Sequence, residues 1–292
     1  MDEAPALPDR RLHAFRPDLA DLRLQGRVPA ERFVAPRPAR IARGLVPVRP
    51  MPDQAAAIDT YFTAGEAVDL FEAAAGWAWC QSRDDGYVGY VDADALDMTV
   101  PAADLSHVAN MLAFVFAEPD LKTGVRDVLP RHARVALADR PAITTRNTLY
   151  RELQCGGFVA QAALADSPPR CASLPAAARL YLGAPYLWAG KSFAGIDCSG
   201  LVQRAFQDIG RAVPRDTDMQ QAHFATAIAA RSAADLRPGD LVFGRGHVGI
   251  ATGDAILHAE GTRHMRVLEQ PADAFFAEVF GGDIAAATIR RP

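Results

Sequence analysis

The segment PYLWAGKSFAGIDCSGLVQRAFQDIG, residues 185–210, contains the strongest structural signal in the chain. The apolar residues of its second half recur at helical spacing, and they are Leu201, Val202, Ala205, Phe206 and Ile209, with Gly210 as a stop. Cys198 stands in the first turn of this predicted helix, where unpaired N–H groups and the helix dipole favour a negative charge. Its backbone N–H can also point at a developing oxyanion. We predict that Cys198 is a nucleophile; the alternative is a buried structural cysteine.

Two histidines follow on predicted strands. His247 begins a strand after a glycine-flanked turn in RPGDLVFGRGHVGIAT (237–252), and His258 lies in DAILHAEG (254–261). Antiparallel strands joined by the turn TGD (252–254) bring the two positions roughly side by side. His247 can then take the proton of Cys198, and His258 can hold the tautomer of His247. Taken singly, His247 has the alternative of a solvated turn histidine, and His258 is better explained as a core or surface histidine.

The region around these residues mixes helices and strands. LPAAARLYLG (174–183) predicts a short helix, and DLVFG, HVGIAT, AILHAEG and MRVLEQ predict strands. A helix packed on an antiparallel sheet makes an α+β domain, which we place at residues 171–292.

The residues before 171 differ in composition and in their pattern of apolar residues. Residues 1–40 are rich in Arg, Pro and Ala and predict an extended arm or linker. Short runs rich in Val, Tyr, Trp and Phe follow, separated by turn residues, and predict a small β-barrel at 41–103. The pattern repeats at 104–166, where a strand again meets a proline turn, as in VRPMPD (48–53) and FAEPDL (116–121). We predict a second barrel there; the alternative is one larger irregular β domain.

Charge and composition exclude several classes of protein. The net charge is −4 with both signs interspersed, so no basic stripe for nucleic acid or an anionic membrane is present. No apolar run reaches the roughly 18–20 residues of a membrane span. The start, MDEAPALPDRRLHAF, lacks the apolar run of a secretory signal, so a cytoplasmic location is expected, with export as the alternative. The four cysteines form no CxxC pair and no nucleotide motif appears, so no metal or cofactor is expected.

The combined motifs carry a family resemblance. DCSGLVQ (197–203), followed by LRPGDLVF (236–243), HVGIATGD (247–254) and ILHAEG (256–261), resembles the NlpC/P60 family of cysteine peptidases. The resemblance implies a papain-like catalytic domain with Cys198 as nucleophile, His247 as base and His258 as orienting residue. The run from 41 to 103 resembles a bacterial SH3 domain, so two SH3-like barrels are expected ahead of the catalytic domain.

The resemblance also implies a substrate. Family members with SH3 domains are implicated in cutting γ-D-glutamyl-diamino acid bonds of cell-wall peptides. By position, Tyr186 lines the site, Trp188 walls the pocket, and Asp216, in VPRDTDMQ (213–220), receives the free amine of an N-terminal L-alanine, a contact that Ser199 shares. Tyr87, in DDGYVGYV (84–91), closes the pocket, so that only short free murein peptides enter and a role in recycling follows.

Each of these assignments has a structural alternative. Tyr186 and Trp188 are also explained as core aromatics, and Asp216 as a helix N-cap. Tyr87 is also explained by ordinary SH3 packing, although Tyr90 is the better core candidate. Other functions that fit the motifs are an exported peptidoglycan endopeptidase acting on intact wall, a catalytically inactive wall-binding module, and an acyltransferase or amidase with the same triad.

Overall fold

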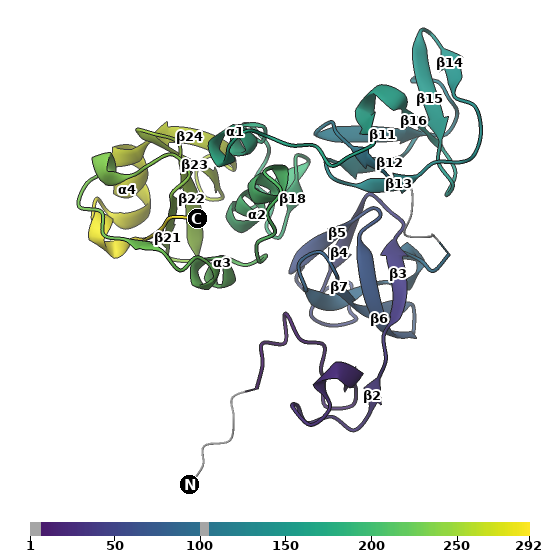
Figure 1. The fold of residues 1–292 in the computed structure, drawn as a ribbon, viewed down its shortest axis with the longest axis horizontal. Coiled ribbons are helices and arrows are strands. Elements are labelled where there is room, and N and C mark those ends of the chain that lie inside the picture. The colour runs from purple at the N-terminus through teal and green to yellow at the C-terminus, as the bar shows by residue number, and fades with distance from the viewer. Residues whose placement is uncertain (1–6, 100–104) are drawn as a thin grey trace. The chain divides into compact units, whose positions relative to one another are not determined.

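The computed structural model describes residues 7–99 and 105–292 (Figure 1). The chain folds into two compact units. The first holds the described residues up to Val108 together with Ala113–Leu129 and Ala133–Asp166; the second holds Ala109–Leu112, Pro130–His132 and Ser167–Pro292. The predicted boundary at 103/104 lies outside the described residues. None of the described helices combines the length and the apolar character needed to cross a membrane.

The N-terminal segment is folded where an extended arm was predicted. Strands β1 (Ala20–Asp21) and β2 (Phe33–Val34) pair in parallel, with the 3₁₀ turn η1 (Leu22–Leu24) between them. Ala14 and Leu19 pack against Phe71 and Trp79 of the first SH3-like domain. Burying the apolar side chains of this segment against the neighbouring sheet stabilises its folded form.

The first SH3-like domain contains a five-stranded sheet in the order β8-β7-β6-β3-β9 and the hairpin β4-β5. Their bounds are β3 Arg37–Ile41, β4 Leu45–Val48, β5 Thr60–Thr63, β6 Ala67–Ala74, β7 Trp77–Ser82, β8 Val88–Asp92 and β9 Leu96–Asp97, with η2 at Ala93–Ala95. Strand β3 starts inside the segment predicted as an arm, because it pairs with both β6 and β9.

Tyr87, rather than Tyr90, is the core tyrosine of this domain, contrary to the prediction. Tyr87 is 3% exposed and belongs to the apolar core with Ile41 and Phe62. Tyr90 is half-buried and stacks on Trp79 instead. The sequence DDGYVGYV did not reveal this, because the two tyrosines lie three residues apart and only Tyr90 lies within a regular strand, β8.

The second SH3-like domain has its own core, which includes Val108, Val115, Leu129 and Val159. Its strands form two sheets, ordered β13-β10-β17 and β12-β11-β16-β15-β14. The bounds are β10 Leu105–Val108, β11 Leu112–Phe116, β12 Val125–Pro130, β13 Arg134–Ala136, β14 Ile143–Thr145, β15 Thr148–Glu152, β16 Phe158–Ala160 and β17 Leu164–Ala165, with η3 at Gln161–Ala163. This core is distinct from that of the first SH3-like domain, and the division into two domains stays a prediction.

The second unit is an α+β domain, as predicted. Its antiparallel sheet has the order β20-β25-β21-β22-β23-β24. The strands are β18 Lys191–Ser192, β19 Gly195–Ile196, β20 Ala227–Ile228, β21 Leu241–Gly244, β22 His247–Ala251, β23 Ala255–Glu260, β24 Arg266–Pro271 and β25 Thr288–Arg290. The helices are α1 Leu174–Arg179, α2 Cys198–Asp208, α3 Thr217–His223 and α4 Ala272–Phe280, with 3₁₀ turns η4 Ala233–Asp235 and η5 Ile284–Ala286.

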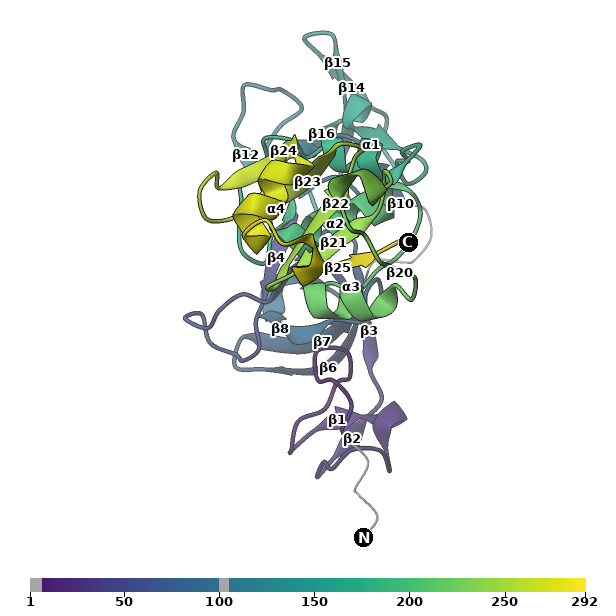
Figure 2. The same ribbon diagram turned by 90° about the vertical axis from the view of Figure 1, so that its left-hand side faces the viewer.

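Helices cover both faces of this sheet (Figures 1 and 2). Alternate residues of each strand point to opposite faces, so Phe243 and Ile250 pack with α2 while Val242 and Ala251 pack with α4. Helix α2, which begins at Cys198, therefore lies against the strands that carry the two histidines.

His132, a histidine outside the motifs of the site, is buried. It is 5% exposed, and its Nε2 lies 3.1 Å from Asp208 Oδ1 at the end of α2. Arg131 donates to the same carboxylate oxygen at 2.7 Å. The Asp208 side chain is fully buried, and a buried carboxylate needs such partners.

Candidate active site

Cys198 is the first residue of helix α2. Asp197 caps the helix by accepting a hydrogen bond from the Gly200 backbone N–H at 2.7 Å. Gly200 is required here, because a Cβ at this position would lie 2.3 Å from the carbonyl oxygen of Gly190. The close passage of two backbone segments thus fixes the turn that presents the sulfur.

The Cys198 sulfur is nearly enclosed, at 7% residue exposure. Burial, followed by the negative charge of Asp197, raises the pKa of the thiol to about 11, although the backbone N–H of Val248 and the Thr217 hydroxyl favour the thiolate. Val248 directly follows His247 in strand β22, so its hydrogen bond ties the sulfur to the start of that strand. At neutral pH the group is a thiol and needs a base to become a nucleophile.

His247 and His258 are brought together as the motif predicts. His247 Nε2 lies 2.8 Å from His258 Nδ1, with the two rings nearly perpendicular at 80°. The register pairs Ile250 with Leu257, and continuing it sets Gly249 opposite His258, so the histidines meet diagonally. A Cβ at Gly249 would contact Ile256 and the Phe275 ring.

Burial controls the charge of both imidazoles. It lowers the pKa of His247 to about 4, against the opposing charges of Glu260 and Asp197. It also lowers the pKa of His258 to about 4, with the proximity of His247 acting in the same direction. Both rings are therefore neutral at physiological pH, and His247 can accept a proton.

The proton positions follow from the contact between the rings. Of the two nitrogens in contact, His247 Nε2 and His258 Nδ1, one must donate the hydrogen bond and the other must accept it. If Nε2 of His247 donates to Nδ1 of His258, then Nδ1 of His247 is unprotonated and is the basic atom left for the thiol. The proton of His258 then sits on its Nε2.

Tyr186 lies beside the nucleophile, on the segment before β18. Burial, followed by the charges of Cys198 and Asp197, raises the pKa of Tyr186 to about 12, so the phenol keeps its proton. Its backbone N–H donates to the Met265 carbonyl at 2.8 Å. Gly261 lies against its ring, since a Cβ there would come within 2.6 Å of ring atoms. The loop 261–265 is thus the support of Tyr186.

Glu260 holds this loop and was missed by the sequence analysis. Its carboxylate accepts from the backbone N–H groups of Thr262, Arg263 and His264 at 2.7, 2.8 and 2.6 Å. Burial opposes its charge, but the hydrogen bond from the Thr262 hydroxyl and those from the three backbone N–H groups outweigh it and lower the pKa of Glu260 to about 2. Strand alternation was the available signal, since Glu260 and His258 are two residues apart on β23 and share a face.

Arg215 forms a second feature that sequence reasoning missed. Its guanidinium is 1% exposed and pairs with both oxygens of Asp197, at 3.1 and 2.8 Å. It also donates to the Ser199 hydroxyl at 2.7 Å, and that hydroxyl donates to Asp197 at 3.3 Å. The donor of Ser199 is therefore already used within a buried network that fixes the start of α2. Partners 18 residues apart leave no periodic signal in one sequence.

The other residues predicted to bind substrate differ in burial and in position. Trp188 is 70% exposed, which excludes the core alternative and leaves its role at the pocket a prediction. Asp216 occupies the N-cap position of α3, but its side chain makes no capping hydrogen bond. Tyr87 belongs to the first unit, and its role in closing the site stays a prediction. Within residues 7–99 and 105–292, no three His, Cys, Asp or Glu side chains are grouped to hold a metal ion.

Ala189, between Trp188 and Gly190, has an unusual backbone conformation. Its φ is +66°, in the left-handed region that favours glycine. The loop therefore keeps the conformation that glycine would adopt, with an alanine methyl that is 1% exposed.

Comparisons with known proteins identify two domains of the chain. The NlpC/P60 family model matches residues 183–283, and the bacterial dipeptidyl-peptidase SH3 domain model matches residues 48–96. A crystal structure of an NlpC/P60 family protein from Bacillus cereus superposes with a TM-score of 0.66 at 19% identity, over 87% of this chain and 99% of that one. At this identity the likeness shows the fold.

Two curated relatives share the C-terminal region. A probable endopeptidase of Mycobacterium bovis is 38% identical over 101 residues, which are 34% of this chain and 25% of that protein. A gamma-D-glutamyl-L-lysine dipeptidyl-peptidase of Bacillus subtilis is 38% identical over 91 residues, 28% of this chain and 29% of that protein. The matches thus span under a third of these relatives. The chain contains an NlpC/P60 family domain and, ahead of it, a bacterial dipeptidyl-peptidase SH3 domain.

Proposed function

We propose that the protein is a cysteine peptidase that hydrolyses the γ-D-glutamyl-diamino acid bond of short murein peptides carrying a free N-terminal L-alanine. The single observation that carries the proposal is the 2.8 Å contact between His247 Nε2 and His258 Nδ1, on the strand whose Val248 N–H binds the Cys198 sulfur. A base with a fixed tautomer beside a buried thiol is the arrangement that nucleophilic acyl transfer needs.

The reaction proceeds in two steps. His247 Nδ1 takes the thiol proton as the Cys198 sulfur adds to the γ-carbonyl carbon of D-glutamate. In this proposal, the Cys198 backbone N–H and the Tyr186 hydroxyl donate to the resulting oxyanion. The amine of the diamino acid leaves with the proton from His247, and a thioester remains. Water activated by His247 then hydrolyses the thioester and regenerates the thiol.

The substrate class is supported by the comparisons and by Asp216. The Bacillus subtilis relative is named for a γ-D-glutamyl-L-lysine dipeptidyl-peptidase activity, and the first domain matches the SH3 model of such enzymes. Asp216 lies at the start of α3, and the next residue, Thr217, has its hydroxyl 4.0 Å from the Cys198 sulfur. A carboxylate here suits the ammonium group of a free N-terminus. With this specificity, the enzyme acts on released peptides in the cytoplasm and serves their recycling.

The test is mass spectrometry of L-Ala-γ-D-Glu-diaminopimelate peptides after incubation with the protein. The expected product is the dipeptide L-Ala-D-Glu together with free diaminopimelate-containing peptide. Release of muropeptides from intact sacculi at a comparable rate would instead favour an exported endopeptidase. Binding to wall without turnover of any peptide would favour an inactive module.

A further inference from the structure

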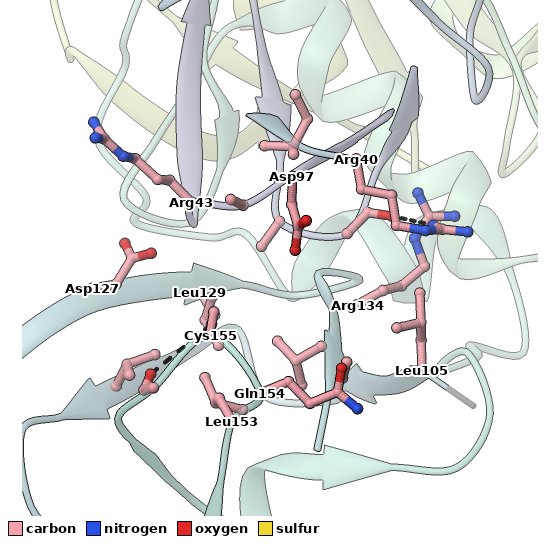
Figure 3. Close-up of a pocket in the computed structure, with 18 of the residues that line it drawn as sticks. Arg40, Arg43, Asp97, Leu105, Asp127, Leu129, Arg134, Leu153, Gln154 and Cys155 are labelled. Atoms are coloured by element: carbon pink, nitrogen blue, oxygen red, sulfur yellow. Dashed lines mark hydrogen bonds between the residues drawn. The ribbon is translucent and has the colours of Figure 1, made fainter. Parts of the chain in front are cut away.

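A cavity of about 320 Å³ lies in the first unit, between the two SH3-like domains (Figure 3). Hydrogen bonds from backbone N–H groups join the domains that form it. Gly44 N–H donates to Asp127 at 2.7 Å, and Arg134 N–H donates to the Ala64 carbonyl at 2.8 Å. A Cβ at Gly65 would lie 2.2 Å from the Arg134 carbonyl oxygen, so the backbones approach closely. These contacts therefore fix the two sides of the cavity relative to one another.

The lining of this cavity is apolar on one side. Leu129 and Leu153 belong to the core of the second SH3-like domain and also line the cavity, together with Val115. A volume of this size is at the lower end of small-molecule sites, which typically combine an apolar lining with a few polar groups. It accommodates a molecule of the size of an amino acid or a dipeptide.

One arginine of the cavity lining, Arg40, lacks an ion-pair partner among the described residues. Arg40 and Arg134 point toward one another across its edge (Figure 3). Arg134 pairs with Asp84 at 2.6 Å, whereas Arg40 donates only to the Gly65 carbonyl and has no carboxylate partner in the described part of the chain. Burial, followed by the charge of Arg134, lowers the pKa of Arg40. Of these two guanidinium groups, Arg134 therefore has a carboxylate partner and Arg40 has none among the described residues.

The carboxylates of the lining have other partners. Asp94 pairs with Arg43 at 2.6 Å, Asp127 accepts from the backbone of Gly44 and Val128, and Asp97 accepts from Thr99. An anion from outside would complete the environment of Arg40. Arg fits carboxylate well, because its planar fork donates two parallel hydrogen bonds.

We propose that this cavity binds a small organic carboxylate, with its anionic group on Arg40 and Arg134 and its apolar part against Leu129 and Leu153. The ligand class is an amino acid or short peptide with an apolar side chain. The site lies in the first unit, whereas Cys198 lies in the second, and the proposal is independent of the proposed peptidase activity.

The test uses the full chain carrying Cys198→Ala, so that no probe is turned over, and isothermal titration with N-acetyl-L-leucine. The blocked amine of this probe makes it a poor partner for Asp216. We expect a Kd of about 1 mM or tighter, as befits a small ligand. Arg40→Gln is expected to weaken binding about tenfold or more, the value of a charge-assisted hydrogen bond. Arg134→Gln, an independent variant, is expected to weaken it as well.

The matched control is Arg140→Gln, which removes an arginine that is 70% exposed and paired with Glu152 in the same domain. It is expected to bind like the parent protein, and circular dichroism checks the folding of every variant. N-acetyl-L-leucinamide, which lacks the carboxylate, is expected not to bind. Absence of binding to the parent protein, or an unchanged Kd in both folded arginine variants, would overturn the proposal. Equal affinity for inorganic phosphate would overturn the apolar part of the site.

Discussion

Nε2 of His247 and Nδ1 of His258 are 2.8 Å apart, so each imidazole fixes the orientation of the other. The contact uses one nitrogen of His247 and leaves the opposite nitrogen, Nδ1, as its basic atom. Both rings pack on Phe275, with centroids 6.2 and 5.0 Å away, which limits their rotation. The following predictions depend on this arrangement.

Substitutions of the three triad residues are expected to lower activity by different amounts. Cys198→Ala and His247→Ala should each lower kcat/KM by about 10³-fold or more, as loss of a nucleophile or base does in comparable enzymes. His258→Gln should leave more activity, since it removes orientation but not the base. His223→Ala, an exposed histidine on α3, is the control and should retain activity. A larger loss of kcat/KM in the His258 variant than in the His247 variant would reverse the assigned roles.

The reactivity of Cys198 is expected to rise steeply with pH. The pKa values of about 11 for Cys198 and about 4 for His247 describe a neutral thiol and imidazole, so the thiolate fraction increases about tenfold per pH unit above neutrality. Iodoacetamide labelling followed by mass spectrometry measures this rate. A rate that is constant between pH 6 and 9 would indicate a preformed thiolate-imidazolium pair instead.

The pH profile of kcat/KM is expected to keep activity well into the acid range. A base with a lowered pKa stays unprotonated until the pH falls to that pKa, so the acid limb should lie near pH 4 rather than near 6.5. Activity that halves close to pH 6.5 would contradict the burial of His247 in the free enzyme.

Glu260→Gln is expected to disturb Tyr186 through the loop 261–265. One carboxylate oxygen is replaced by an amide donor, so at least one of three backbone N–H groups loses its acceptor. The free energy of unfolding should fall by about 1–2 kcal/mol, and kcat should fall more than KM rises. Removing the negative charge should also move the acid limb to lower pH, because Glu260 favours the protonated form of His247.

Glu260 should also contribute to stability in a defined pH window. Its folded-state pKa of about 2 lies below the ordinary value of 4.5. The carboxylate therefore stabilises the fold above pH 4.5, and this contribution is lost as the pH falls through 2. Glu269→Gln is the control. Glu269 lies on β24 and pairs with Arg179 of α1 rather than with the loop 261–265. An unchanged acid limb in Glu260→Gln would remove the electrostatic role.

Selectivity for a free N-terminus is expected from Asp216. N-acetylation of L-Ala-γ-D-Glu-diaminopimelate removes the cation and should lower kcat/KM by about tenfold or more. Asp216→Asn should lose activity on the free peptide and most of the discrimination, whereas Asp273→Asn, at the exposed start of α4, should keep both. Equal kcat/KM on free and acetylated peptides by the unaltered enzyme would refute the assignment.

Local sequence patterns predicted the α+β class and helix α2. Apolar spacing places Leu201 and Ala205 in the core, and the glycine-flanked turn sets His247 at the start of its strand. Ion pairs between distant residues were not predictable, because Arg215 and Asp197 carry no spacing signal. The buried state of His132 was missed for the same reason, since its partner Asp208 is 76 residues away.

The contact of Arg131 and His132 with Asp208 has a consequence for modularity. The C-terminal unit is continuous in space but not in sequence, since it includes Pro130–His132 from between β12 and β13. A fragment cut at residue 167 would leave the buried Asp208 carboxylate without both side-chain partners, a loss of about 3–5 kcal/mol. A fragment that keeps the whole C-terminal unit, for transfer into another protein or for expression alone, therefore begins ahead of residue 109 rather than at residue 167.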